Sequence, residues 1–164
     1  MYVRAKLTPC VAGADCGAGN VHTILLHTSP LSKVLSVFPA VPPSWTDVGF
    51  HQLRAGGGLL VSANRTAGST KFVRLLSENG GPITLHVNDP AWTGATVPTA
   101  IPSSVKVAAA AAGQGEWTVT GLGANASVVL FVGSAAPELV IAPLAGNASE
   151  FNWWGYRREM QPLH

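Results

Sequence analysis

The stretch VFPAVPPSWTDVGFHQLRAGGGLLVSA, residues 37–63, decides the fold predicted for this chain. Each proline holds its own φ near about −65° and biases the preceding residue toward extended backbone. The segment from Pro39 to Pro43 therefore predicts a stiff crossover and not a helix. The glycines of residues 56–58 lead into a β-type run at residues 59–63. The stretch thus indicates an architectural role, a rigid corner that feeds strands.

Short β-type runs separated by turn residues continue outward from this stretch, a pattern typical of an all-β sandwich. Residues 59–63 and 71–76 flank a polar turn and predict a hairpin. Residues 128–132 form a continuous apolar run, which favours a central strand covered on both faces. Further strands are predicted at residues 83–87, 105–111, 116–120 and 139–144. We expect an antiparallel, two-layer, jelly-roll-like β-sandwich with a flexible, glycine-rich N-terminal arm.

The order of these segments resembles a known domain. FPAVPPSW at residues 38–45, LRAGGGLLVSA at 53–63 and the following hairpin are similar to the C-terminal β-domain of glycoside hydrolase family 95, the α-L-fucosidase A-like enzymes. In that family a Leu-Leu-Gln-Ser-His-like segment joins an (α/α)6 barrel to the β-domain, and LLHTS at residues 25–29 occupies the matching place. The resemblance covers about residues 21–77 and is looser to about residue 144.

The resemblance implies a domain organisation and a role. Residues 1–20 would be the flexible arm, 21–36 a remnant of the barrel-to-sandwich connection, 37–146 the sandwich and 147–164 an aromatic tail. The domain would pack on and stabilise an (α/α)6 catalytic barrel that is absent from this chain. Hydrolysis of fucosylated glycans would belong to the complete enzyme. Met1 is then either the natural start or the start of a fragment.

Composition limits the other function classes. Apolar residues make up 47% of the chain and charged residues 11%, against about 25% charged in an average globular protein. Either another domain or chain covers part of the surface, or the composition reflects an alanine- and glycine-rich bias such as residues 108–112. The net charge of +2 argues against nucleic acid as a partner. No apolar run approaches the about 20 residues of a membrane span.

Three features of the sequence bear on the cellular compartment: the N-terminus, the cysteines and the glycosylation sequons. The first ten residues, MYVRAKLTPC, lack the apolar core of a signal peptide. Cys10 and Cys16 fit either a local disulfide or two free thiols. Glycosylation sequons begin at Asn64, Asn125 and Asn147, all in predicted turns. They slightly favour a secretory or extracellular setting for the parent enzyme.

The titratable residues form no recognisable catalytic or metal-binding pattern. Glycoside hydrolysis normally needs two facing carboxyl groups. Most carboxylates here, Asp89 in Asn-Asp-Pro among them, lie beside turn residues and are predicted to be solvated. The histidines lack metal-ligand spacing, and His27, the only one with a family-based case for function, is interpreted as structural. We therefore expect no catalytic residue, no metal and no cofactor.

Aromatic side chains give the alternative function, because exposed aromatic rings can stack on sugar rings. Trp45 and Trp117 are predicted to lie in the core by their pattern. Candidate sugar contacts of a free-standing carbohydrate-binding module are Trp92, Trp153, Trp154 and Tyr156. Packing of the aromatic tail onto the sandwich is the competing interpretation. A plain protein interaction domain is the third hypothesis.

Overall fold

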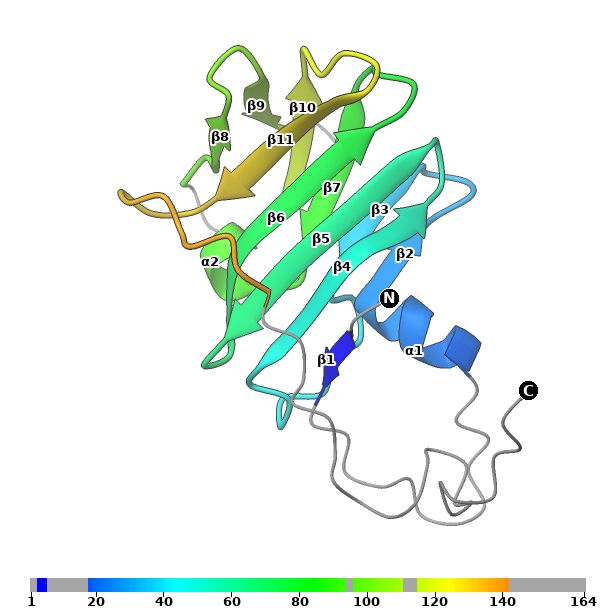
Figure 1. Ribbon diagram of the computed structural model, residues 1–164, viewed down its shortest axis with the longest axis vertical. Helices are drawn as coiled ribbons and strands as arrows, with labels where there is room; N and C mark the ends of the chain where they lie inside the picture. The colour runs from blue at the N-terminus through cyan, green and yellow to red at the C-terminus, as the bar shows by residue number, and fades with distance from the viewer. Residues whose placement is uncertain (1–2, 6–17, 94–95, 111–114, 142–164) are drawn as a thin grey trace, which may run out of the picture.

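The computed structural model describes residues 3–5, 18–93, 96–110 and 115–141 and confirms an all-β sandwich of two sheets (Figure 1). Within these residues, sheet A has the spatial order β1 (Val3–Ala5), β4 (Val48–Ala55), β5 (Leu59–Thr66), β6 (Ser69–Ser77), β11 (Ala126–Phe131), β8 (Thr99–Ile101). Sheet B has the order β2 (Leu26–Thr28), β3 (Val34–Val37), β7 (Ile83–Val87), β10 (Glu116–Thr120), β9 (Lys106–Ala109). In the described part of the chain, two short helices, α1 (Ala18–Leu25) and α2 (Pro90–Thr93), accompany the sheets.

The proline segment carries the chain from one sheet to the other, as the sequence predicts. It leaves β3 of sheet B and enters β4 of sheet A. Phe38 begins the corner with a positive φ of 55°, and its buried ring packs edge-on against Phe50 with 5.4 Å between ring centroids. Trp45 is partly buried against the core. The side chains of Phe38 and Trp45 therefore anchor the corner to the core.

Consecutive hairpins form the centre of sheet A. β4, β5 and β6 pair antiparallel in chain order, which confirms the predicted hairpin. Ala67 and Gly68 both have positive φ, as a type I′ turn requires. Glycines 56–58 make the β4–β5 turn and lead into β5 at Leu59, as the sequence predicts. A register shift lies between Phe50 and Leu53 of β4.

The core lies between the two sheets and follows the alternation in the sequence. Ile83, Leu85 and Val87 of β7 are buried, and the residues between them are half-buried. In β11, Val128 and Leu130 join the main core, whereas Val129 and Phe131 pack with Phe72 on the other face. The prediction of a strand covered on both faces is therefore confirmed. Trp117 is buried, as predicted.

The N-terminal part of the sandwich begins earlier than the predicted boundary at residue 37. β2 and β3 form a hairpin, and β3 pairs with β7 in parallel, so residues 26–37 already belong to sheet B. Of the predicted arm at residues 1–20, β1 pairs with β4 and Ala18 begins helix α1. The rest of that arm, including Cys10 and Cys16, lies outside the described residues.

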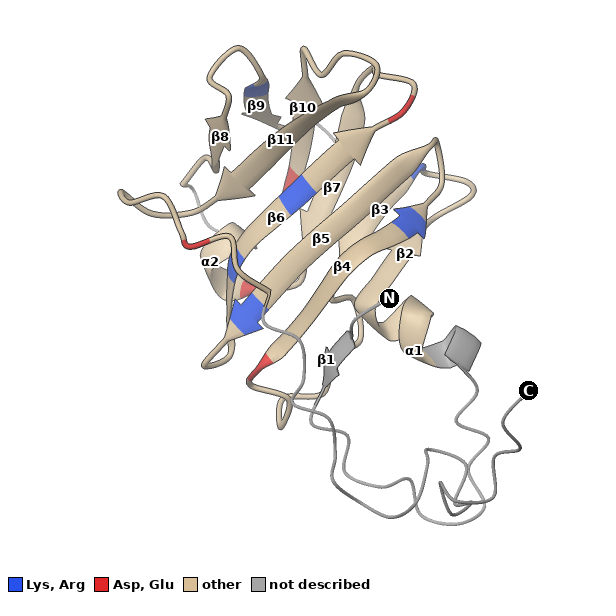
Figure 2. Cartoon of the chain, in the orientation of Figure 1, with Lys and Arg blue, Asp and Glu red and all other residues tan. Residues whose placement is uncertain are grey.

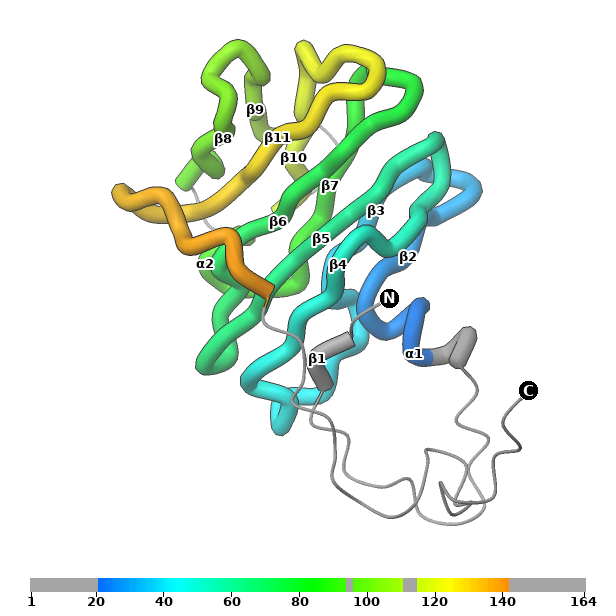
Figure 3. The backbone as a smooth tube through the Cα atoms, in the orientation of Figure 1, coloured from blue at the N-terminus to red at the C-terminus, as the bar shows by residue number. Residues whose placement is uncertain are grey.

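The strand predicted at residues 139–144 is wrong for residues 139–141, which form no regular element. Figure 3 shows this last described segment crossing in front of sheet A. Ile141 packs there with Phe72, Val129 and Phe131, so its apolar contacts come from crossing a sheet face and not from joining a ladder. Among the described helices, none has the length and apolar character of a membrane span.

Candidate functional site

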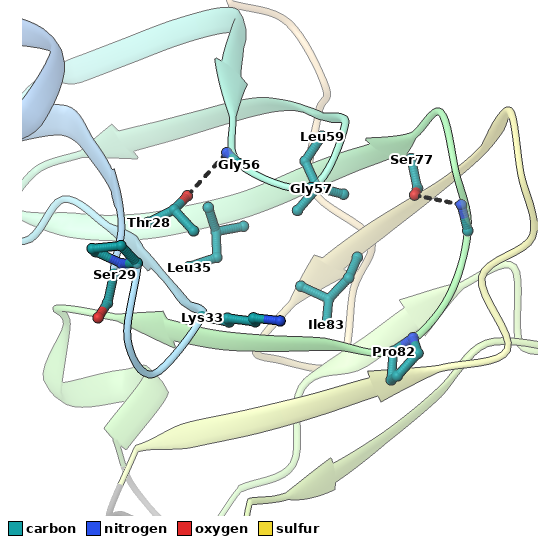
Figure 4. Close-up of a pocket in the computed structure, with 12 residues that line it drawn as sticks. Thr28, Ser29, Lys33, Leu35, Gly56, Gly57, Leu59, Ser77, Pro82 and Ile83 are labelled. Carbon is teal, nitrogen blue, oxygen red and sulfur yellow. Dashed lines mark hydrogen bonds between the residues drawn. The ribbon is translucent and has the colours of Figure 1, made fainter.

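A pocket of about 430 Å³ opens at one end of the sandwich, between the edges of the two sheets (Figure 4). Three connections border it: the β2–β3 loop, the β4–β5 turn and the β6–β7 turn. Its lining consists of Thr28, Ser29, Pro30, Lys33, Leu35, Gly56, Gly57, Leu59, Ser77, Gly80, Pro82 and Ile83. We refer to it as the end pocket.

The β2–β3 loop places the charged group of the end pocket. The Ser29 amide donates to the Val34 carbonyl at 3.0 Å, and the Lys33 amide donates to the Ser29 carbonyl at 2.9 Å. Lys33 itself has a positive φ of 55°, which turns the chain back into β3. Figure 4 shows the Lys33 side chain extending from this loop toward Ile83 and Pro82. The ammonium group therefore lies at the pocket.

The polar rim is built by hydroxyl groups that tie neighbouring turns together. The Gly56 amide donates to Thr28 Oγ1 at 3.2 Å, which links the β4–β5 turn to β2. The Gly80 amide donates to Ser77 Oγ at 2.9 Å, which closes the β6–β7 turn (Figure 4). Because each oxygen accepts from a backbone amide, each hydroxyl proton is left to be donated elsewhere.

Gly80 has no room for a side chain. Its φ is +72°, and an added Cβ would lie 2.8 Å from the Ala124 amide nitrogen and 2.9 Å from the Gly123 carbonyl carbon. The β6–β7 turn is thereby held against the β10–β11 connection, since these are backbone atoms that cannot rotate away. This close approach fixes one wall of the end pocket.

An exposed ion pair lies beside the end pocket. Arg54 donates from both guanidinium Nη atoms to the two carboxylate oxygens of Glu78, each at 2.8 Å. These hydrogen bonds lower the pKa of Glu78 below its ordinary value, and the positive charge of Arg54 acts in the same direction. The negative charge of Glu78 is thus compensated by Arg54, whereas the Lys33 ammonium group has no hydrogen-bond or ion-pair partner within the described residues.

We expect Arg54→Met to raise the titration midpoint of the Glu78 carboxyl group, because the mutation removes the groups that favour its charged form. Since the folded-state pKa is the lower one, the pair's contribution to stability is present above the unfolded pKa and is lost as pH falls through the folded pKa. Carbon-detected NMR titration measures the midpoint. Lys106→Met, far along the sequence on β9, serves as the control. Equal midpoints in the wild type and in Arg54→Met would contradict the assignment.

A polar row crosses the outer face of sheet B. His27, Ser36, His86 and Glu116 are successive register partners on β2, β3, β7 and β10. His86 Nδ1 lies 3.2 Å from the Gly115 carbonyl oxygen, and His27 is exposed. No group of three or more His, Cys, Asp or Glu residues in the described part of the chain is arranged to hold a metal ion.

Two residues predicted at the surface are buried. Trp92, a candidate sugar contact, is 0% exposed, so that prediction is corrected: its indole Nε1 donates to the Thr70 carbonyl at 3.0 Å beneath α2. Asp89, predicted to be solvated, is 3% exposed and accepts hydrogen bonds from the amides of Thr70 and Ala91. The local Asn-Asp-Pro pattern did not reveal that the α2 turn folds over the sheet.

The remaining candidates are separated from the end pocket. Trp153, Trp154 and Tyr156 lie outside the described residues. Of the sequons, Asn125 is exposed in a turn, whereas Asn64 is half-buried within β5 and not in a turn, and Asn147 lies outside the described residues. The sequence matches no protein-family model and no curated protein.

Sequence reasoning missed the end pocket itself. One signal for it was available, because Lys33 is the single Lys, Arg, Asp or Glu between Asp15 and Asp47. A solitary charge in an otherwise uncharged segment marks a position worth testing. Thr28 and Ser77 gave no such signal, because their hydroxyls belong to the pocket only through the way in which separate turns come together in the fold.

Proposed function

We propose that this protein is a non-catalytic β-sandwich domain of the kind found after the barrel of family 95 α-L-fucosidases. It packs on an (α/α)6 catalytic barrel, in the same or another chain, and stabilises it. Hydrolysis of fucosyl linkages belongs to that barrel, and this domain supplies no acid, base or nucleophile.

The main support for the proposal is the composition of the end pocket. Two facing carboxyl groups are the usual requirement for glycoside hydrolysis, yet the lining has no Asp, Glu or His. The described carboxylates near it or in the core have structural partners: Glu78 is paired with Arg54, and Asp89 accepts backbone hydrogen bonds. These arrangements favour a structural domain over a hydrolase site.

The exposed surface also favours packing against another protein. The described charged side chains of sheet A lie on β4, β5 and β6, whereas β8 and β11 at its other edge carry none (Figure 2). Large apolar side chains remain exposed beside it: Val97 is 51% exposed, Ile101 48%, Leu139 49% and Val140 58%. Burying such groups against a partner would be favourable. The same observation favours the more general alternative, a protein interaction domain with a partner other than a barrel.

The test uses an antibody raised against this domain. We expect the immunoprecipitate from an extract of the source organism to hydrolyse p-nitrophenyl α-L-fucoside, and the purified 164-residue chain to show no such activity. A blot of the same extract would show either a band well above 16.9 kDa or a co-precipitated larger chain. Pre-immune serum is the control.

Two outcomes would overturn the proposal. Hydrolysis by the purified chain would make the domain an enzyme in its own right. An inactive precipitate that contains only a band near 16.9 kDa would leave a free-standing domain. Titration with fucosylated glycans would then test the carbohydrate-binding alternative through Trp153, Trp154 and Tyr156, since Trp92 is not accessible.

A further inference from the structure

The end pocket presents hydrogen-bond donors together with one positive charge. Lys33 is exposed and its ammonium group has no partner within the described residues, so that group has three donors to offer. The hydroxyls of Thr28 and Ser77 already accept from the amides of Gly56 and Gly80. Their protons find no acceptor among the described residues. This combination is complementary to an anionic, acceptor-rich group.

The floor of the end pocket is aliphatic. Leu35 and Ile83 from sheet B and Leu59 from sheet A line it, and all three side chains are almost fully buried. No aromatic ring lines the pocket, so it lacks the stacking platform that recognises a sugar ring. Its volume of about 430 Å³ falls within the range of small-molecule sites, about 300–1,000 Å³.

We propose that the end pocket binds a small carboxylate with an aliphatic body, of which a medium-chain fatty acid is the simplest example. The carboxylate lies against Lys33 and accepts from the hydroxyls of Thr28 and Ser77. The hydrocarbon chain lies on Leu35, Leu59 and Ile83. This site is independent of the proposed packing on a barrel, because it uses the end of the sandwich and requires no second protein.

The test is an NMR titration of the full chain with octanoate. We expect saturable shifts of the backbone amides of Gly56, Gly57 and Gly80, which line the end pocket, with a dissociation constant in the millimolar range or below. Octanamide, which has the same chain and no charge, should bind about tenfold more weakly or worse, because a hydrogen bond to a charged group is worth more than a neutral one.

Two matched lysine variants test whether the charge of Lys33 is required for octanoate binding. Lys33→Met should weaken octanoate binding about tenfold or more and leave octanamide binding unchanged. Methionine is also an L residue of similar length, so the positive φ at position 33 is no more strained in the variant. Lys106→Met removes another exposed lysine, which is not part of the lining, and should bind octanoate like the wild type.

Several outcomes would overturn this inference. Octanoate and octanamide binding equally, or Lys33→Met binding octanoate like the wild type, would remove the role of the charge. Glycine amides that do not shift at saturating octanoate would show that octanoate does not bind in the end pocket. Tighter binding of glucuronate than of octanoate would make the pocket a site for sugar acids. None of these results depends on whether the immunoprecipitate has fucosidase activity.

Discussion

Replacing Trp92 by alanine is expected to lower the free energy of unfolding by about 3–5 kcal/mol. Trp92 is the largest of the fully buried side chains. Its indole Nε1 donates to the Thr70 carbonyl at 3.0 Å, and its own carbonyl accepts from the indole of Trp117 at 2.8 Å. The alanine variant would leave a cavity and would remove the indole donor from the buried Thr70 carbonyl. Urea denaturation followed by far-UV circular dichroism measures the loss.

A second variant of Trp92 separates the causes of this loss, and a variant at an exposed position serves as the control. Trp92→Phe keeps most of the ring volume and removes the indole donor, so it should be less destabilising than alanine. Val140→Ala trims a side chain that is 58% exposed and should change the free energy of unfolding by no more than about 0.5 kcal/mol. A loss below about 1 kcal/mol for Trp92→Ala would contradict the burial of this side chain.

Replacing Asp89 by alanine is expected to cost about 2–4 kcal/mol. Its Oδ2 accepts from the Thr70 amide at 2.5 Å and its Oδ1 from the Ala91 amide at 2.9 Å. The first bond joins β6 to the start of α2, and the second caps that helical turn. Removing the carboxylate would leave two backbone donors without their acceptor, one of them buried. Chemical denaturation at neutral pH measures the change.

A matched aspartate gives the control. Asp47 also accepts a backbone amide, from Ala67, but at 3.4 Å and in a more exposed setting, so Asp47→Ala should cost less than about 1 kcal/mol. Asp89→Asn retains one acceptor oxygen and should lose less stability than Asp89→Ala. Equal stability of the Asp89→Ala and Asp47→Ala variants would show that the buried contacts of Asp89 contribute little.

The two large effects should not be additive. Asp89 contacts the amide of Thr70, and Trp92 contacts the carbonyl of the same residue. Residues that share a partner commonly show coupling energies of about 0.5–3 kcal/mol. We therefore expect the double variant to lose less stability than the two single losses added together, because either change alone already loosens α2 from β6.

The candidate site could be predicted from sequence only in part. Lys33 is an isolated charge in the sequence but was not predicted as a site residue, and its neighbours in the end pocket come from β2, the β4–β5 turn and the β6–β7 turn. These segments lie up to 55 positions apart, from Thr28 to Ile83. Which of their hydroxyls accept a backbone amide depends on how the turns meet, and no local pattern encodes that.

The all-β sandwich could be predicted from the sequence because its signals are local. The side-chain alternation of β7, the apolar run of β11 and the prolines between β3 and β4 each act over a few residues. Only the tertiary structure decided that β3 pairs in parallel with β7, that residues 26–37 belong to the sandwich, and that Trp92 and Asp89 are buried. Burial and register depend on which distant surfaces meet, because the free energy gained comes from contacts between segments and not from the segments themselves.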